Sequence, residues 1–496
     1  MSPFSLQLAG SLLPLVAIAS GVSLCANQTS LCQQVDCQLP GRVSYSGSSA
    51  YISSQSNYYT GNERDLEPGC VFRPTKTSDV SHFVKLVAAS NSTSTPEFAF
   101  RCGGHSFFAG AANIDGGVTV DLRSLDLFEL SADQKTASVG GGSIWSENVY
   151  PNLEPHNLTV AGGRITGVGV GGFVTGGGLN FLERRNGFAC DNIYGYEVVL
   201  GTGEVVYASA DSNRDLWLAL KGGSNNFGIV TRFDLVTHSQ GLMLGGSIDF
   251  NVTQTVLDDH AKAFSSWMDV QNFDPLAVME VNFVWDDGAW SLADAIYYLA
   301  PDLNPSVYEE FFSIPNQIEN NLALKNVTAI VEESAELVPS TVSRAIQMNY
   351  SFKNGNASIY SQLFQTFVDA VDSISDVEGL VLDFLMQPHP VTNGTNSLGL
   401  SPNVTDRVLV DIGAAYNNAA DDDTIDAAVQ GIFDHHVQIL QDAGLFLNFT
   451  YLNYAGANQD PIGTYGDLAT LQGVSKKYDP HGIFQTAVPG LFKLFT

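Results

Sequence analysis

The chain has 496 residues, of which 44% are apolar, so it is long enough to bury the cores of two domains. Its 52 acidic and 22 basic side chains give a net charge of −30. This charge argues against a nucleic-acid partner, because phosphate binding needs a basic surface, and it disfavours docking onto an anionic membrane. We therefore expect an acidic monomer that binds neither nucleic acid nor membrane.

The N-terminus has the pattern of a secretory signal peptide. Residues 6–15 are largely apolar and Ala17-Ile18-Ala19 offers a cleavage site, so we predict that residues 1–19 are removed. The alternative, a membrane anchor, is disfavoured because the apolar run is short and broken. A high density of N-x-S/T sequons also favours secretion to the extracellular space. These sequons begin at Asn27, Asn91, Asn157, Asn251, Asn326, Asn349, Asn356, Asn393, Asn403 and Asn448.

Six cysteines follow the predicted cleavage site. In an oxidising compartment the first four are expected to form two disulfides, and the sequence leaves all three pairings open. These four are Cys25, Cys32, Cys37 and Cys70. Cys102 and Cys190 are interpreted as buried free thiols, since neither has a second Cys or His at ligand spacing. We predict no metal site.

Residues 20–240 are dense in glycine and alternate short strands with helices. A strand at 70–74, a helix at 80–90 and a strand at 98–100 form a predicted β-α-β unit. Its second strand ends at residue 101, where crossover folds often bind ligands. Further strands are predicted at 116–122, 137–140, 158–160 and 228–233, helices at 144–153 and 215–221, and a hairpin at 197–207.

Beyond residue 241 the glycine content falls, which is typical of a larger sheet-and-helix domain. We predict strands at 245–250, 278–285 and 292–299, and helices at 258–270, 358–373 and 423–443. The segment from residue 448 onward is again aromatic and glycine-bearing, like the first part of the chain.

Two glycine-rich loops carry the chemistry. The first, Arg101-Cys102-Gly103-Gly104-His105-Ser106, presents one imidazole beside two glycines. The second runs from Gly162 to Gly178 and contains a formal G-x-G-x-x-G match at residues 167–172. Because glycines continue past this match, we expect an extended loop whose amides approach a pyrophosphate, not a long Rossmann helix. The alternatives are a glycine-rich packing loop and a histidine held in a tight turn.

Together these motifs resemble the berberine-bridge-enzyme-like flavoproteins of the vanillyl-alcohol-oxidase superfamily, particularly secreted fungal members. The resemblance covers nearly the whole mature chain. It rests on the two loops and, in order, on residues 111–117, 187–192, 221–231 and 451–454. It implies an α+β fold with a PCMH-type FAD-binding domain, built from 20–240 and 448–496. Residues 241–447 would form a substrate domain with an antiparallel sheet covered by helices.

The resemblance also implies how FAD is held. His105 would be joined covalently to the flavin 8α-methyl, whereas Ile165 occupies the position at which many relatives place a second, cysteinyl link. A singly attached flavin is therefore expected. The residues implied to bind the cofactor are Arg101, Cys102, Gly103, Gly104, His105, Ser106, Thr166, Gly167, Val168, Gly169, Gly172, Gly178, Gly187, Asp191, Gly228, Ile229, Val230 and Tyr454.

For catalysis the resemblance points to Tyr451, as general base or as an aromatic contact of FAD, and to Asn453. Val168 would leave O2 a path to the flavin. The second domain, which would supply the substrate contacts, shows no transferable motif and offers only Gln387 and His389 as candidates. The implied activity is a secreted oxidase that passes a hydride from an alcohol or other C–H centre to flavin N5 and forms H2O2. Its substrate would be a sugar, an oligosaccharide or a secondary metabolite.

Two alternatives remain open at this stage. A dehydrogenase would use another electron acceptor, and a catalytically silent protein of the same fold would only bind its ligand.

Overall fold

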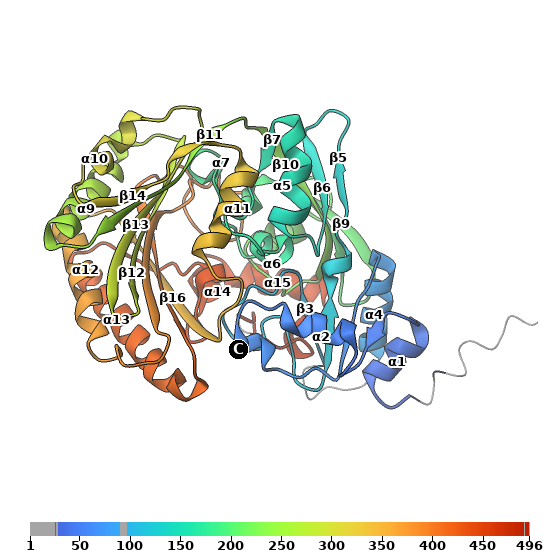
Figure 1. Cartoon of the computed structure of the whole chain (residues 1–496). Coiled ribbons are helices and arrows are strands. Elements are labelled where there is room, and N and C mark those ends of the chain that lie inside the picture. Colours follow the sequence, from blue (N-terminus) through green and yellow to red (C-terminus); the bar gives the residue numbers. More distant parts are fainter. Residues whose placement is uncertain (1–24, 26–27, 90–96, 491, 496) are drawn as a thin grey trace, which may run out of the picture.

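The computed structural model describes residues 25, 28–89, 97–490 and 492–495 (Figure 1). The predicted signal peptide and the sequons at Asn27 and Asn91 lie outside these residues. Three β-sheets organise the rest of the chain.

The first sheet contains the predicted β-α-β unit, which is confirmed. Its strand order is β1-β2-β4-β3, with β2, β4 and β3 parallel. The strands are β1 (Val43–Ser44), β2 (Cys70–Phe72), β3 (Phe98–Arg101) and β4 (Val118–Asp121). Helix α4 (Thr77–Ala89) begins three residues before the predicted start and buries Val80, Phe83, Val84 and Val87 along one stripe. β3 then delivers the chain directly into the first glycine loop.

The second sheet is antiparallel and six-stranded, in the order β5-β6-β10-β8-β9 with β7 paired to β10. Its strands are β5 (Phe128–Leu130), β6 (Thr136–Gly140), β7 (Leu158–Val160), β8 (Ile193–Val199), β9 (Val205–Ser209) and β10 (Ile229–Ser239). The helical segments inserted among them are η2 (Trp145–Val149), α5 (Tyr150–Leu153), α6 (Val170–Thr175), α7 (Glu183–Asn186), η4 (Ala189–Asn192) and α8 (Arg214–Ala219). The second glycine loop therefore belongs to this layer.

The third sheet has nine antiparallel strands in the order β14-β11-β13-β12-β17-β18-β16-β19, with β15 paired to β11. They are β11 (Met243–Asn251), β12 (Ala277–Asp286), β13 (Ala289–Tyr298), β14 (Gln317–Asn320), β15 (Ala323–Lys325), β16 (Arg344–Lys353), β17 (Val381–Pro388), β18 (Arg407–Tyr416) and β19 (Phe446–Leu447). Four helices cover its outer face, as expected (Figure 1): α9 (Gln254–Trp267), α10 (Glu309–Phe312), α12 (Ala357–Val371) and α13 (Asp422–Asp442).

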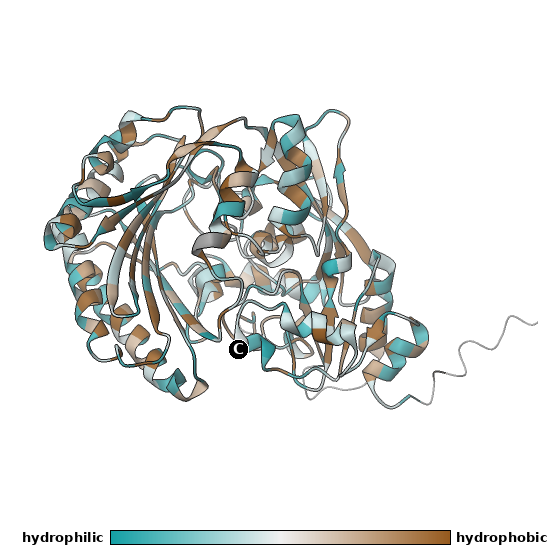
Figure 2. Cartoon of the chain, in the orientation of Figure 1, coloured by the Kyte–Doolittle hydropathy of each residue, from teal (hydrophilic) through white to brown (hydrophobic). Residues whose placement is uncertain are grey.

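The core of the third sheet lies between its strands and these helices. Apolar residues, brown in Figure 2, follow the strands and the inner sides of α12 and α13, while hydrophilic residues mark their outer sides. The opposite face of the sheet looks toward the first two sheets, and helix α11 (Val327–Leu337) lies between the two halves (Figure 1).

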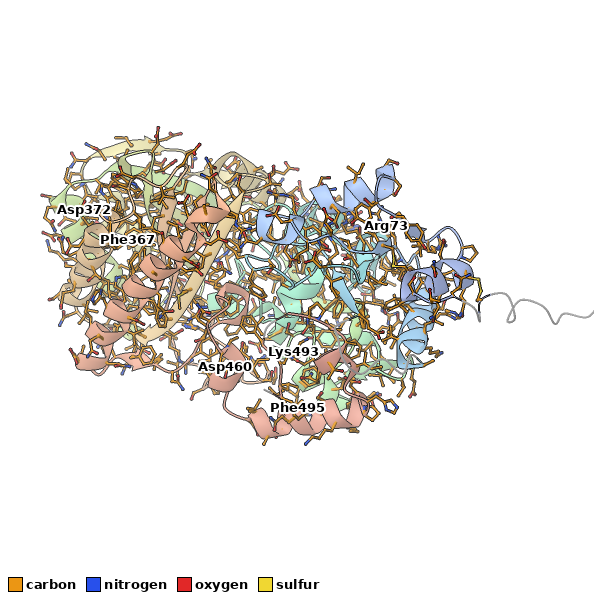
Figure 3. The ribbon with its side chains drawn as sticks, turned by 90° about the horizontal axis from the view of Figure 1, so that it is seen from below. Arg73, Phe367, Asp372, Asp460, Lys493 and Phe495 are labelled. Carbon is orange, nitrogen blue, oxygen red and sulfur yellow. A yellow bond between two sulfur atoms is a disulfide. The ribbon has the colours of Figure 1, made fainter. Side chains whose placement is uncertain are left out.

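The C-terminal segment packs against the first two sheets. Leu471 and Val474 of α15 (Leu468–Tyr478) share a core with the second sheet, and Phe484 of α16 (Ile483–Thr486) shares one with the first. Figure 3 shows this end of the chain from below, near Lys493 and Phe495. The domain boundaries proposed from the sequence stay a prediction.

The structure selects one of the three disulfide pairings. Cys25 is bonded to Cys37 and Cys32 to Cys70, whereas Cys102 and Cys190 are free thiols. Within the described ranges, no group of three or more His, Cys, Asp or Glu side chains is arranged to hold a metal ion. In the same residues, no helix has the length and apolar character needed to cross a membrane.

Candidate active site

The two glycine loops meet backbone to backbone. A Cβ atom added to Gly103 would lie 2.5 Å from the nitrogen of Gly169, and one added to Gly169 would lie 2.3 Å from the nitrogen of Gly103. Any side chain at either position would push the loops apart. Glycine is therefore required here for close approach, not for flexibility.

The second loop is not extended as predicted, because it contains the six-residue helix α6. The helix starts at Val170, and its first turn packs on Cys102: a Cβ atom added to Gly171 would lie 2.2 Å from the Cys102 sulfur. Burial raises the pKa of Cys102 to about 11, so it is a protonated thiol at neutral pH. These contacts let a short helix replace the extended run expected from the glycine count.

His105 is stacked face to face on Tyr59. The ring centroids are 4.1 Å apart and the planes differ by 12°. Burial lowers the pKa of His105 to about 4, so the imidazole is neutral at physiological pH. The backbone of Tyr59 bonds to Gly104 on one side and to Val342 on the other. The imidazole is thus held at the junction of the first loop and the segment that enters β16.

Arg101 holds the first loop in place. Its guanidinium donates to the carbonyl of Ser54 at 2.6 Å and to that of Gly103 at 3.2 Å. It also lies 3.9 Å from the ring centroid of Tyr58. The side chain of Arg101 therefore faces the protein around β3, and its contact with the glycine loop is through the Gly103 carbonyl.

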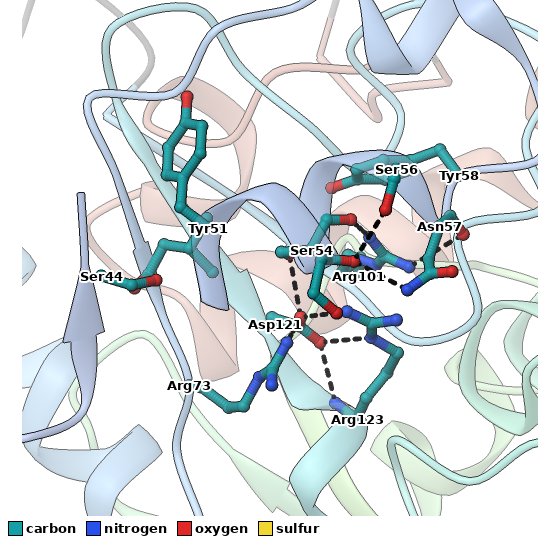
Figure 4. Close-up of polar contacts among 12 residues, drawn as sticks. Ser44, Tyr51, Ser54, Ser56, Asn57, Tyr58, Arg73, Arg101, Asp121 and Arg123 are labelled. Atoms are coloured by element: carbon teal, nitrogen blue, oxygen red, sulfur yellow. Dashed lines mark hydrogen bonds and ion pairs between the residues drawn. The ribbon is translucent and has the colours of Figure 1, made fainter. Parts of the chain in front are cut away.

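Asp121, at the end of the neighbouring strand β4, completes this support (Figure 4). Its carboxylate accepts hydrogen bonds from Ser54 at 2.9 Å, Arg73 at 2.8 Å and Arg123 at 2.7 Å. Burial alone would raise the pKa of Asp121, but the Arg123 hydrogen bond and the charges of Arg101, Arg123 and Arg73 hold it well below its usual range. The network fixes the point at which β3 becomes the loop.

Tyr451 and Asn453 fasten the far end of the second glycine loop. The Tyr451 hydroxyl accepts hydrogen bonds from the Gly178 amide and from Asn453 Nδ2, both at 2.9 Å. A Cβ atom on Gly176 would lie 1.9 Å from Asn453 Oδ1, so the glycine makes room for this amide. Burial raises the pKa of Tyr451, which keeps the phenol protonated at neutral pH.

Arg164 connects the second loop to the third sheet. Its guanidinium pairs with Glu280 of β12 at 2.6 Å, donates to Gln387 of β17 at 2.7 Å and lies 3.7 Å from Glu183. Gln387 in turn donates to the hydroxyl of Tyr454 at 3.5 Å. Sequence reasoning gave no role to Glu280, because a single acidic residue in a strand carries no motif.

The remaining predicted residues border the same two loops. The amide of Thr166 donates to Ser334 of α11 at 3.1 Å, and the carbonyl of Val168 accepts from Trp145 at 3.2 Å. A Cβ atom on Gly141 would lie 2.3 Å from the carbonyl of Val230, which brings the start of β10 close to this layer. Gly228 precedes that strand and Ile229 begins it.

Gly187 and Asp191 form a turn beside the other end of the second loop. Gly187 has φ +81°, and Asp191 accepts from the Phe188 amide at 3.1 Å and from Asn396 at 2.7 Å. None of these contacts reaches the first loop. His389, the other sequence candidate, is buried and bonds to Ser351 of β16 at 2.8 Å.

These residues fit FAD. In the described part of the chain, the amides of Gly103, Gly104 and Ser106 have no hydrogen-bond acceptor. Neighbouring free amides on a glycine turn are the donor set that a pyrophosphate requires. The cofactor would be held by these amides and the touching glycine backbones, with the His105 imidazole beside it.

Comparison with known proteins agrees with this fit. Residues 68–209 match the FAD binding domain family. The chain is 33% identical to the FAD-dependent monooxygenase tpcD of Cochliobolus heterostrophus over 463 residues, covering 89% of this chain and 88% of that protein.

Solved structures share the fold at lower identity. BBE-like 1 of Physcomitrella patens superposes with a TM-score of 0.76 at 22% identity, covering 94% of this chain and 100% of the other. Glucooligosaccharide oxidase of Acremonium strictum, described with a 6-S-cysteinyl, 8α-N1-histidyl FAD, superposes with a TM-score of 0.73 at 18% identity, covering 92% and 97%.

The fold and the loops define a flavoprotein oxidoreductase with a PCMH-type FAD-binding domain. Within that class, the chain belongs to the family of FAD-dependent oxidoreductases that includes tpcD, and it shares its fold with the berberine-bridge-enzyme-like proteins. It is an FAD-dependent enzyme.

Proposed function

We propose that this enzyme is an oxidase whose FAD is attached covalently to His105. The observation that carries the proposal is the neutral imidazole of His105, fixed by its stack on Tyr59 beside the free amides of the first loop. A neutral imidazole has the lone pair needed to bond to a flavin methyl carbon. The 8α-N1-histidyl FAD of the glucooligosaccharide oxidase supports the same assignment.

The test is whether flavin stays with the denatured protein. Acid-precipitated wild-type protein is expected to remain yellow, and the His105→Ala variant is expected to release its FAD into the supernatant. Wild-type protein that releases all its flavin would contradict the proposal. Tyr59→Leu serves as the matched control, because it removes the stacking partner but leaves the imidazole.

A single covalent link is expected. The relative's second link is cysteinyl, whereas the family resemblance assigns the corresponding position in this chain to Ile165, which cannot form such a link. The two free thiols do not replace it, since Cys102 packs on the first turn of α6 and Cys190 is fully buried. Mass spectrometry of a digest should find FAD on the peptide containing His105 and no flavin on the peptide containing Ile165.

When bound, FAD supplies a two-electron acceptor for a C–H bond of the substrate. The chain's own residues hold the loops in place, and one of them, Tyr451, is a candidate for proton transfer. Tyr451 and Asn453 clamp the glycine loop, and the raised pKa of Tyr451 makes its phenol a poor base. The Tyr451→Phe variant distinguishes a role of Tyr451 as a general base from a role as a clamp of the glycine loop. Loss of a base lowers the rate of flavin reduction about 100-fold, whereas loss of a clamp weakens flavin binding and stability.

The electron acceptor is proposed to be O2, with Val168 leaving a path to the flavin. The relatives named FAD-dependent monooxygenases favour a second candidate, a monooxygenase that inserts an oxygen atom into its substrate. A substrate-panel assay separates the two, because an oxidase forms one H2O2 per substrate. A monooxygenase would instead place heavy-isotope oxygen in the product. Turnover only with an added dye would indicate a dehydrogenase.

We also propose that the protein is secreted and glycosylated. Its two disulfides are typical of an oxidising compartment. Six of the predicted sequon asparagines are exposed: Asn157, Asn251, Asn356, Asn393, Asn403 and Asn448. Glycosidase treatment of protein from a secreting host should lower its mass, and an unchanged mass would contradict the proposal.

A further inference from the structure

We propose that Arg184 and Trp267 form a second ligand site, separate from the glycine loops, that binds the carboxylate of a small zwitterion. The two residues meet between α7 and the last residue of α9, near β12 of the third sheet. The site goes beyond the proposed oxidase function, because neither residue belongs to the two glycine loops. Its ligand class follows from a buried cation, an aromatic wall and an acidic rim.

Arg184 is a buried cation without a partner. Its side chain belongs to a residue that is only 2% exposed, and Nε, Nη1 and Nη2 have no hydrogen-bond acceptor among the residues that the structure describes. Burial lowers its pKa to about 10, so the guanidinium is charged at neutral pH. A buried charge is costly unless an opposite charge and hydrogen bonds compensate it. The guanidinium therefore requires an anion.

The protein does not supply this anion. Two carboxylates act on Arg184 through their charge, Glu183 and Asp274, but neither forms an ion pair with it in the described ranges. Glu183 instead lies 3.7 Å from Arg164. Asp274 accepts hydrogen bonds from the Tyr298 hydroxyl at 3.2 Å and from the amide of residue 276 at 2.8 Å. Both carboxylates are thus engaged elsewhere.

Aromatic rings leave the edge of the guanidinium as its binding surface. The guanidinium carbon of Arg184 lies over the Trp267 ring at 4.2 Å and over the Phe273 ring at 4.7 Å. Because the rings cover the plane of the group, its N–H donors remain at the edge, where a carboxylate binds through two parallel hydrogen bonds. Nε1 of Trp267 is also buried without an acceptor and offers a further donor beside them.

A cavity of about 820 Å³ connects these rings with the outer surface. Its walls are formed by α9, by η5 (Val270–Asn272) with the segment that follows it, by η6 (Ser306–Tyr308) and by α10, on the outer side of the third sheet (Figure 1). Trp267 and Phe273 belong to the lining. The volume is in the range of small-molecule sites, so an organic ligand fits between the surface and the two rings.

The rim of the cavity selects the overall charge of the ligand. Asp259 pairs with Lys262 at 3.0 Å, so these two side chains neutralise each other. Glu309 and Glu310 remain, both exposed on the lining of the cavity. A dianion such as phosphate would meet these carboxylates on its way to Arg184, whereas an ammonium group is attracted to them. A ligand with a carboxylate at one end and an ammonium at the other therefore matches the cavity.

The first test compares three probes that have six-carbon chains and differ in charge: 6-aminohexanoate, hexanoate and hexylamine. Calorimetric titration of the FAD-loaded enzyme at low ionic strength is expected to show that 6-aminohexanoate binds about threefold more tightly than hexanoate, since exposed ion pairs add little. Hexylamine is expected to bind at least about tenfold more weakly than 6-aminohexanoate. Any other order of affinities would overturn the ligand class.

The second test locates the binding of 6-aminohexanoate. Arg184→Met is expected to weaken it about tenfold, and Trp267→Phe, which keeps a ring but removes the N–H donor, about threefold. The matched control is Arg185→Met, the same change at the next residue, which is exposed and donates to Asn186. Wild-type affinity in Arg184→Met would overturn the site, and so would an equal loss in the two arginine variants.

The third test measures melting temperatures without and with 6-aminohexanoate. Because the desolvation of an unpaired buried cation outweighs its contact with the rings, ligand-free Arg184→Met is expected to melt at a higher temperature than the wild type. The probe is expected to raise the melting temperature of the wild type and of Arg185→Met, but not that of Arg184→Met. A lower melting temperature of Arg184→Met would show that the cation is paired within the protein and would overturn the proposal.

Arg184→Lys keeps the proposal testable if the methionine variant does not fold. It retains the positive charge but lacks the fork that binds a carboxylate through two hydrogen bonds. The lysine variant is expected to bind FAD normally and to bind 6-aminohexanoate about tenfold more weakly than the wild type. Unchanged affinity for the probe would overturn the role of the guanidinium.

Discussion

The glycine loops and the inward face of the third sheet are built in opposite ways. The loops are built from touching glycine backbones and unpaired amides, with the His105 imidazole beside them. The sheet face is built from side chains such as Glu280, Asp383 and Gln387, each on a different part of the strands. Close backbone contacts require a contiguous glycine motif in the sequence, whereas single side chains on separate strands form no motif that the sequence could reveal.

Arg164 joins these two regions, and its loss is expected to have the largest effect. Arg164→Met would leave Glu280 and Glu183 without their cation in a buried setting, at a cost of about 4 kcal/mol in the free energy of unfolding. Chemical denaturation measures this loss. Arg164→Lys, which retains the positive charge, is the control. An equal loss of stability in both variants would show that the planar shape of the guanidinium matters more than its charge.

The backbone contact of the loops is tested by Gly169→Ala. Because the new Cβ atom would meet the Gly103 nitrogen, we expect a loss of about 3 kcal/mol and of bound flavin, measured by denaturation and by absorption. Gly473→Ala on α15 is the matched control, since nothing lies within 4 Å of its added Cβ atom. Normal flavin content in Gly169→Ala would mean that the loops can separate without harm.

The sheet face should show the opposite behaviour, a gain of stability on removing a charge. Asp383 has a folded pKa of about 6, above its unfolded value of about 4. The stability it contributes is therefore complete below pH 4 and is lost as the pH rises through about 6. Asp383→Asn should be as stable as the wild type at pH 4 and about 3 kcal/mol more stable at pH 8. Parallel pH profiles of the two proteins would contradict a raised pKa of Asp383 in the folded protein.

Asn349 offers a smaller test at the border of the two regions. Its side chain accepts from the Tyr451 amide at 2.7 Å and donates to the Tyr451 carbonyl at 3.0 Å. Asn349→Leu would leave both backbone groups without a hydrogen-bond partner and lower the free energy of unfolding by about 2 kcal/mol. Because Asn349 is fully buried, we also expect no glycan at this sequon, in contrast to the exposed Asn356. Glycopeptide mapping that finds a glycan on Asn349 would contradict the structure at this point.

Sequence patterns predicted the helices of the third layer well but missed three of its central strands. α9, α12 and α13 alternate buried and exposed residues with a helical period, which the sequence displays. In β18 nine of the ten residues are buried, so the sequence shows no alternation of apolar and polar residues that would predict a strand. The missed strands, β16, β17 and β18, include the one that carries Asp383, and this is why the sequence offered only Gln387 and His389 there.

The sequence by itself determined the FAD-binding class of the protein, the position of His105 and the absence of a cysteine at Ile165. These three features depend on residues that are contiguous in the chain, where the spacing of glycines indicates which backbone segments can approach a ligand. The disulfide pairing, the short helix α6 and the junction of Arg164 with Glu280 were decided only by the tertiary structure. Each requires groups far apart in sequence to meet, as Arg184 of α7 and Trp267 of α9 do.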